Sequence, residues 1–195
     1  MAPENPEQHV EETIELKDPA MAAFLAWLIP GLGHWYQGRR AKAALYFVCI
    51  MGLFVYGLCL GGNEALGYGR AVYFSWRTGD QRLPYLAQIG VGLPALPALV
   101  QASRMNNHRA VWWNGFMAPP RSGDTREDDP NYNQPTAGDL HRQLARYFEL
   151  AGFFTMVAGL LNVLAIYDAF AGPVVVAPPE KKKEEKQEPV AAAGS

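Results

Sequence analysis

The chain has 195 residues, enough for one ordinary domain, and its formal net charge of −2 at pH 7 excludes the broad basic field of a nucleic-acid-binding protein. Its mean hydropathy of −0.10 is that of a soluble protein, but this average hides how the charges are distributed. Four windows hold no charged residue: 19–38, 43–63, 83–103 and 150–167. Each has about the length that a helix needs to cross a hydrocarbon core of about 30 Å. We therefore predict a membrane protein whose first partner is the lipid bilayer.

Four buried helices of a soluble bundle are the alternative, but such helices normally carry charges on one face. The sequence predicts an all-α fold, a polytopic bundle of about four transmembrane helices with the third one kinked, in the bacterial cytoplasmic membrane. The expected membrane domain covers residues 19–172, with spans at about 20–37, 43–62, 83–103 and 148–171 and a polar loop over 104–146.

The two ends of the chain differ from this apolar domain in composition. Residues 1–18 are acidic and predict a flexible arm, and residues 173–195 predict a low-complexity tail rich in Pro, Lys, Glu and Ala. An acidic start is the reverse of the basic start of a secretory signal. We therefore expect the first window to be retained as a span.

The first window ends in the sequence PGLGHWYQGRRAK, residues 30–42, which is typical of a hairpin corner at a membrane surface. Pro and Gly end the helix, the aromatic rings suit the interface, and the cations meet phosphate head groups. The expected interface motif consists of Gly31, Gly33, His34, Trp35, Tyr36, Gly38, Arg39 and Arg40. His34 is either a titrating group or ligand, or a residue that hydrogen-bonds a backbone carbonyl or a head group.

The second and third windows contain residues that indicate helix packing, and they contain no catalytic or metal-binding motif. Gly57 and Gly61 have the GxxxG spacing that lets another helix approach, and Cys49 and Cys59 are too far apart on one helix for a mutual disulfide. In the third window, Gly90 to Pro97 includes two prolines and two glycines, which predicts a bend there.

The last helix is expected to begin well before its span. Thr136 and Asp139 resemble a capping box, and the apolar spacing that follows predicts a helix running straight into the fourth span. Within that span, one narrow stripe of small and polar residues predicts the face turned to the bundle, while Leu164 lies on the face turned to lipid. Thr155 and Asn162 belong to this stripe, Gly152 and Gly159 flank it, and these four are the expected helix-packing residues of the span. Asp168, near the exit, is either solvated or paired with an arginine.

The run PGLGHWYQGRRAKAALYF resembles the two-transmembrane hairpin domain family, whose first span ends in a Gly-rich turn, then His, aromatics, Gly and a basic residue. That family usually has another aromatic between His and Tyr, and commonly an Asp late in its second span, which this sequence lacks. Over residues 19 to 174 the chain is similar to an uncharacterised bacterial family of four-span integral membrane proteins. The resemblance implies a location and no reaction.

Three functions compete. The first is a non-enzymatic protein that scaffolds, assembles or regulates a membrane partner, which is another protein or a second copy. It follows from the packing faces and from the lack of any catalytic, cofactor or metal motif. The second is a small transporter or channel subunit, favoured by the Gly/Pro-interrupted first and third windows. The third, a membrane-bound enzyme, requires four residues to converge: His34, His108, His141 and Asp168.

Orientation depends on the cations near the span ends. Arg39, Arg40 and Lys42 lie directly at the first loop, and the third loop adds further arginines near its ends. The positive-inside rule then places the first and third loops in the cytoplasm and both termini outside, whereas the Lys-rich tail and the missing signal sequence favour cytoplasmic termini.

Overall fold

The computed structural model describes residues 17–77 and 80–172, and the predicted acidic arm and tail lie almost wholly outside this part. The helical fold expected from the sequence is confirmed. Its α-helices are α1 (Pro19–Leu28), α2 (Leu32–Tyr36), α3 (Arg40–Leu60), α4 (Pro84–Gln88), α5 (Pro97–Asn106), α6 (Ala137–Leu144) and α7 (Arg146–Ala171). Short 3-10 turns are η1 (Ile89–Val91), η2 (Leu93–Ala95) and η3 (Trp113–Gly115), and β1 (Trp76–Arg77) pairs with β2 (Asp80–Gln81) as a two-stranded antiparallel ribbon.

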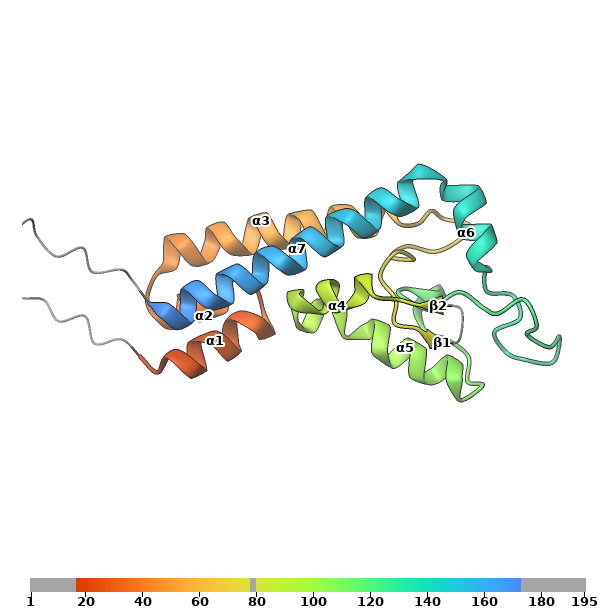
Figure 1. The fold of residues 1–195 in the computed structure, drawn as a ribbon, viewed down its shortest axis with the longest axis horizontal. Helices are drawn as coiled ribbons and strands as arrows, with labels where there is room; N and C mark the ends of the chain where they lie inside the picture. The colour runs from red at the N-terminus through yellow and green to blue at the C-terminus, as the bar shows by residue number, and fades with distance from the viewer. Residues whose placement is uncertain (1–16, 78–79, 173–195) are drawn as a thin grey trace, which may run out of the picture.

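The long helices α3 and α7 lie side by side and run in opposite directions (Figure 1). Gly57 makes their close approach possible, since a Cβ atom there would lie 2.6 Å from the Thr155 methyl group. In the described part of the chain, these two are the helices long and apolar enough to cross a membrane. We call the end of the pair that holds Arg39 and Asp168 the basic end, and the opposite end the loop end.

The first apolar window, expected as a span over 20–37, is not one continuous helix but two short ones. Asp18 caps α1, and the helix ends at Ile29, after which Pro30 and Gly31 reverse the chain into α2. Gly31 has a φ of 84°, which suits glycine, and α2 returns toward the basic end. A side chain at Gly33 would overlap the Ala22 carbonyl, so α2 lies directly against α1.

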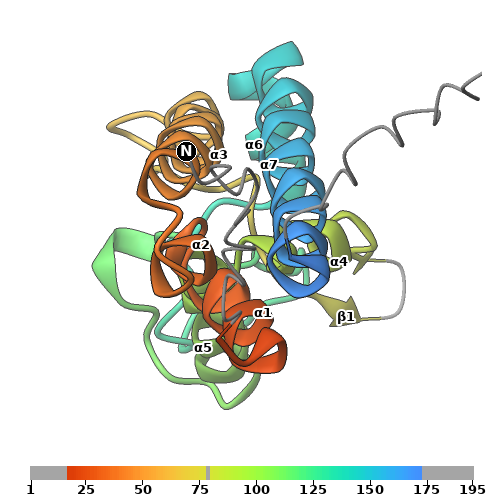
Figure 2. The same cartoon turned by 90° about the vertical axis from the view of Figure 1, so that its left-hand side faces the viewer.

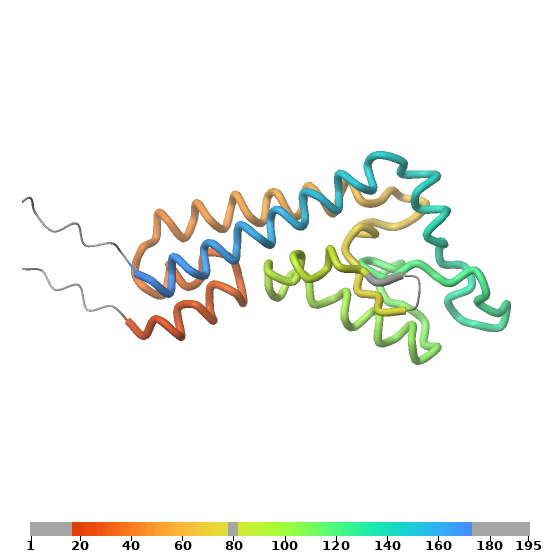
Figure 3. The backbone as a smooth tube through the Cα atoms, in the orientation of Figure 1, coloured from red at the N-terminus to blue at the C-terminus, as the bar shows by residue number. Residues whose placement is uncertain are grey.

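The third apolar window bends much further than the predicted kink, because it reverses completely. The helix α4 ends in η1, Gly92 turns the backbone with φ 87° and ψ −135°, and η2 leads into α5, which returns to the loop end (Figure 3). Arg77 Nη2 donates to Asn106 Oδ1 at 3.0 Å, so the chain before α4 and the end of α5 lie together. The prolines and glycines therefore form a hairpin tip and not a bend within one span.

The two hairpins approach each other from opposite ends of the α3–α7 pair. The tip of α4 and η1 packs on the middle of α7, where Gly90 contacts Gly159. Gly92 contacts the Trp27 carbonyl at the end of α1 so closely that no side chain fits between them. Figure 2, viewed from the basic end, shows α1 beside α7 and α2 beside α3. Each hairpin thus extends over part of the length of the long helices.

The helix before the last span does not run straight into it, contrary to the sequence prediction. Ala145 has a φ of 47° and a ψ of −128°, and this residue separates α6 from α7. The capping box of Thr136 and Asp139 is confirmed at the start of α6. Leu140 and Leu144 then pack on a small core of loop residues at the loop end. The turn at Ala145 lets α6 reach this core, which lies off the axis of α7.

Candidate functional site

The point where the hairpin tips meet is organised by one side chain of α7. Asn162 is fully buried, and its Nδ2 donates to the Ala26 oxygen at 3.1 Å and to the Gly90 oxygen at 2.9 Å. These carbonyls lie near the interrupted ends of α1 and of α4–η1, where helical hydrogen bonding stops. Asn162 therefore ties both hairpins to the same long helix.

A second polar contact lies one to two turns closer to the loop end. Gln88 Nε2 donates to Thr155 Oγ1 at 2.8 Å and to the Ala71 oxygen at 3.2 Å. Both side chains are fully buried. The contact links α4, α7 and the segment after α3, so the polar residues inside the bundle hold elements together.

The basic end carries a cluster of charges around Asp168. Its Oδ2 lies 2.6 Å from His34 Nε2, 2.6 Å from Lys42 Nζ and 3.4 Å from Arg39 Nη2. His34 is fully buried, and Gln37 Nε2 donates to the Ala169 oxygen at 2.6 Å beside it. The cluster connects the α1–α2 hairpin and the start of α3 to the end of α7.

The structure gives His34 a partner that neither interpretation of the sequence named. Its Nε2 lies against the Asp168 carboxylate, a contact that suits a titrating group as well as a packing residue. The resemblance to the hairpin family suggested an Asp in the second span, which is missing here. In this chain the carboxylate beside His34 comes from Asp168 of α7.

The remaining residues of the predicted interface motif lie around this cluster. Trp35 and Arg40 are exposed, Tyr36 is half-buried, and Gly38 forms an open turn with a φ of 83°. Lys17 Nζ lies 5.0 Å from the centre of the Tyr36 ring. Gly31 and Gly33 are instead buried hairpin contacts, since side chains there would meet the Ala43 and Ala22 carbonyls.

The predicted helix-packing residues differ in what they contact. Gly57, Gly61 and Gly159 meet other elements directly: Gly57 meets Thr155, Gly61 meets Ala71 and Ala151, and Gly159 meets Ala87. Gly152 is buried, yet a Cβ atom there would have open space within 4 Å. Its place beside the stripe of small residues therefore does not correspond to a close contact.

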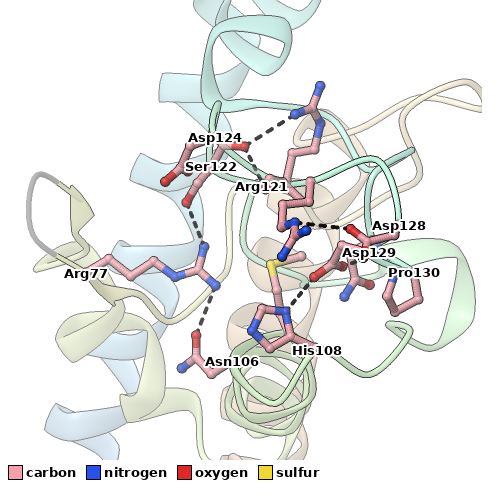
Figure 4. A pocket seen from close by; sticks show the side chains of 13 residues that line it. Arg77, Asn106, His108, Arg121, Ser122, Asp124, Asp128, Asp129 and Pro130 are labelled. Carbon is pink, nitrogen blue, oxygen red and sulfur yellow. Dashed lines mark hydrogen bonds and ion pairs between the residues drawn. The ribbon is translucent and has the colours of Figure 1, made fainter.

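A polar pocket of about 650 Å³ lies at the loop end, between the start of the ribbon, the end of α5 and the loop over 121–131 (Figure 4). Arg77 donates to Ser122 Oγ at 3.2 Å across it. His108 Nδ1 lies 2.6 Å from Asp129 Oδ2, and this hydrogen bond lowers the pKa of the Asp129 carboxyl. The pocket gathers residues of both charges, and sequence spacing gave no indication of it.

Arg70 is a structural residue that sequence reasoning did not single out. Its side chain is 2 % exposed and donates to the Leu66 oxygen at 2.6 Å and to Gln134 Oε1 at 2.9 Å. Burial lowers the pKa of its guanidinium group to about 10. It fastens the loop after α3 to the long polar loop. The aromatic and glycine-rich residues that flank it were the available signal of burial.

The residues required for an enzyme do not converge. His34 and Asp168 lie at the basic end, whereas His108 pairs with Asp129 at the loop end and His141 lies on α6 with Nδ1 2.8 Å from the Ala137 oxygen. Among the described residues, no group of three His, Cys, Asp or Glu side chains could hold a metal ion.

Residues 21–182 match the model of a family of unknown function, DUF6677. The chain belongs to this family. The match confirms the expected resemblance to an uncharacterised family and covers all seven α-helices except the first two residues of α1. No curated protein and no solved structure matches the chain.

Proposed function

We propose that the protein is an integral membrane protein in which α3 and α7 cross the bilayer and the two apolar hairpins enter it from opposite sides without crossing. The support is the exposed surface of the long helices, which carries large apolar side chains along most of its length. On α3 these include Leu45, Val48 and Val55, and on α7 Phe153, Leu160, Leu164 and Phe170. The core helix of a soluble protein would bury such residues.

The helix interruptions are compatible with this placement. Non-helical backbone is tolerated at membrane depth where it is buried in protein. Pro30, Gly31, Gly90 and Gly92, where the helices are interrupted, are all buried. Asn162 donates hydrogen bonds to two backbone carbonyls beside these interruptions.

We infer a non-enzymatic role within this framework: the membrane part is a packed scaffold that presents the folded loop end to a membrane partner. The observation that carries this proposal is the meeting of the hairpin tips, where Gly92 and Gly159 contact carbonyls with no room for a side chain. Such contacts make a rigid support. The partner is another membrane protein or a second copy, and the bacterial cytoplasmic membrane is the proposed location.

Site-specific photo-crosslinking in native membranes tests the scaffold. A photoreactive residue replaces Trp113, which is 64 % exposed at the loop end, and a matched one replaces Tyr167, which is 70 % exposed at the basic end of α7. We expect a reproducible protein adduct from position 113 and mainly lipid adducts from position 167. Lipid or solvent adducts alone at both positions would contradict the scaffold.

A transporter or channel subunit is the second candidate, and one observation favours it. Two interrupted helices meet near the middle of a spanning helix at a buried polar residue, as in the binding regions of many transporters. Reconstituted liposomes loaded with ions or small solutes distinguish the two functions. Flux above that of empty liposomes, abolished by Asn162→Leu, would favour transport over the scaffold.

A further inference from the structure

An apolar groove of about 340 Å³ lies between the elbow of the first hairpin and the first turns of α3. The turn between α1 and α2, called the elbow, contributes Pro30, and α2 contributes Leu32 and Trp35. The facing helix α3 contributes Ala44, Phe47 and Val48. The groove exists because the chain reverses at Gly31 and because α3 presents small side chains opposite the elbow. It follows α3 from its beginning at the basic end for about two turns.

One cation at the mouth of this groove differs from its neighbours. Arg39 and Lys42 face Asp168, whereas Arg40 is exposed and has no carboxylate partner among the described residues. Its guanidinium carbon lies 5.8 Å from the centre of the Trp35 ring, and Trp35 also lines the groove. The apolar groove thus ends at the Trp35 ring and at the unpaired positive charge of Arg40.

We propose that the groove holds one acyl chain of an anionic phospholipid whose phosphate contacts Arg40; this rests on the proposed membrane location. The apolar lining fits a hydrocarbon chain and offers no charged partner to a peptide. Beside it, two cations, Arg39 and Lys42, face the single Asp168 carboxylate, and with the unpaired Arg40 this excess of positive charge favours an anionic head group over a zwitterionic one. Trp35, which is 58 % exposed, lies where the acyl chain of the lipid would meet its head group.

Native mass spectrometry of the purified full-length chain tests this site, with phosphatidylglycerol and phosphatidylcholine as probes. We expect tighter binding of phosphatidylglycerol, and Arg40→Gln should weaken it about fivefold, the effect of one cation near an anionic surface. Arg146→Gln is the matched control, because Arg146 is exposed, lies 5.4 Å from the Tyr147 ring and sits at the loop end. Equal affinity for the two lipids, or equal effects of the two substitutions, would overturn the proposal.

A second pair of variants tests the groove without changing charge. Ala44→Phe fills it and should lower the affinity for both lipids about tenfold, as expected when about two methylene groups lose their contacts. Ala41→Phe, also exposed on α3 but outside the groove, should leave binding unchanged. Undiminished binding by Ala44→Phe contradicts the groove. Failure of the wild-type chain to float with liposomes would instead overturn the membrane location itself.

Discussion

Gly159 and Gly152 lie two turns apart on α7, both are buried, and only Gly159 touches the backbone of another element. An added methyl group at Gly159 would overlap the Ala87 carbonyl and push α4 away from α7. We expect Gly159→Ala to lower the free energy of unfolding by about 2 kcal/mol or more, the scale of overpacking in a core. Thermal unfolding in detergent measures the difference.

Gly152→Ala is the matched control for this prediction. It has open space around it, and alanine is favoured over glycine within a helix by about 0.5–1 kcal/mol. We therefore expect Gly152→Ala to be neutral or stabilising. Equal losses in the two variants would show that glycine content, and not the contact with α4, determines stability.

Asn162→Leu tests the side chain that links both hairpins. The leucine has the same branched shape and the same number of side-chain heavy atoms, but it leaves the Ala26 and Gly90 carbonyls without their donor, so we expect a loss of about 1–3 kcal/mol. Leu164→Ala, on the exposed face of the same helix, should cost much less. A variant at position 162 as stable as wild type would mean that the carbonyls find other donors.

At the scale of elements, the turn between α6 and α7 depends on a residue in an unfavourable conformation. Ala145 has a positive φ with a strongly negative ψ, a region that is accessible mainly to glycine. We expect Ala145→Gly to stabilise the protein by about 1 kcal/mol, even though glycine usually weakens helices. Ala145→Val should destabilise it. A loss of stability in the glycine variant would contradict this account of the turn.

The capping box of α6 predicts a dependence on pH. The Thr136 hydroxyl and backbone hydrogen bonds lower the pKa of Asp139. Its contribution to stability is therefore complete above the unfolded pKa of about 4 and is lost as pH falls through the lower folded value. Thr136→Val should flatten the fall of melting temperature between about pH 5 and 2, and Thr136→Ser, which keeps the hydroxyl, should restore it. Identical slopes in the two variants would exclude this role.

Helix type and end signals could be read from the sequence, but the path of each apolar window could not. The capping box and the apolar windows were visible, because both are local patterns. Windows 19–38 and 83–103 are as free of charge as the core of α3 and α7, and the close glycine contacts that reverse the chain in each window involve residues far away in the sequence. The candidate site shows the same limit, since the partner of His34 is Asp168, which is 134 residues away.

At the scale of the whole molecule, the two hairpins change the topology expected from four spans. In the proposed arrangement, the first loop and both described ends of the chain lie on one side of the membrane, and the loops after α3 and after α5 lie on the other. Four spans would separate Gly38 from the ends of the chain, and Tyr68 from Gly123. In the proposed arrangement, the charge count at four span ends does not apply.

Single-cysteine labelling with an impermeant thiol reagent tests this topology in a variant lacking Cys49 and Cys59. We expect positions 38 and 171 to be labelled from one side, and positions 68 and 123 from the other. All four positions are exposed. Labelling of positions 38 and 123 from the same side would restore the four-span topology.

Asn162 lies on α7, the last helix of the described part of the chain. The hydrogen bonds that it makes to both hairpins can therefore form only late in synthesis. The hairpin of α1 and α2 emerges more than a hundred residues before the side chain that binds its Ala26 carbonyl. Until α7 packs against the hairpins, that carbonyl and the one at Gly90 lack the Asn162 donor. The nascent protein thus holds two unfinished hairpins that α7 fastens, and a chain cut short before α7 should leave both open to cellular quality control.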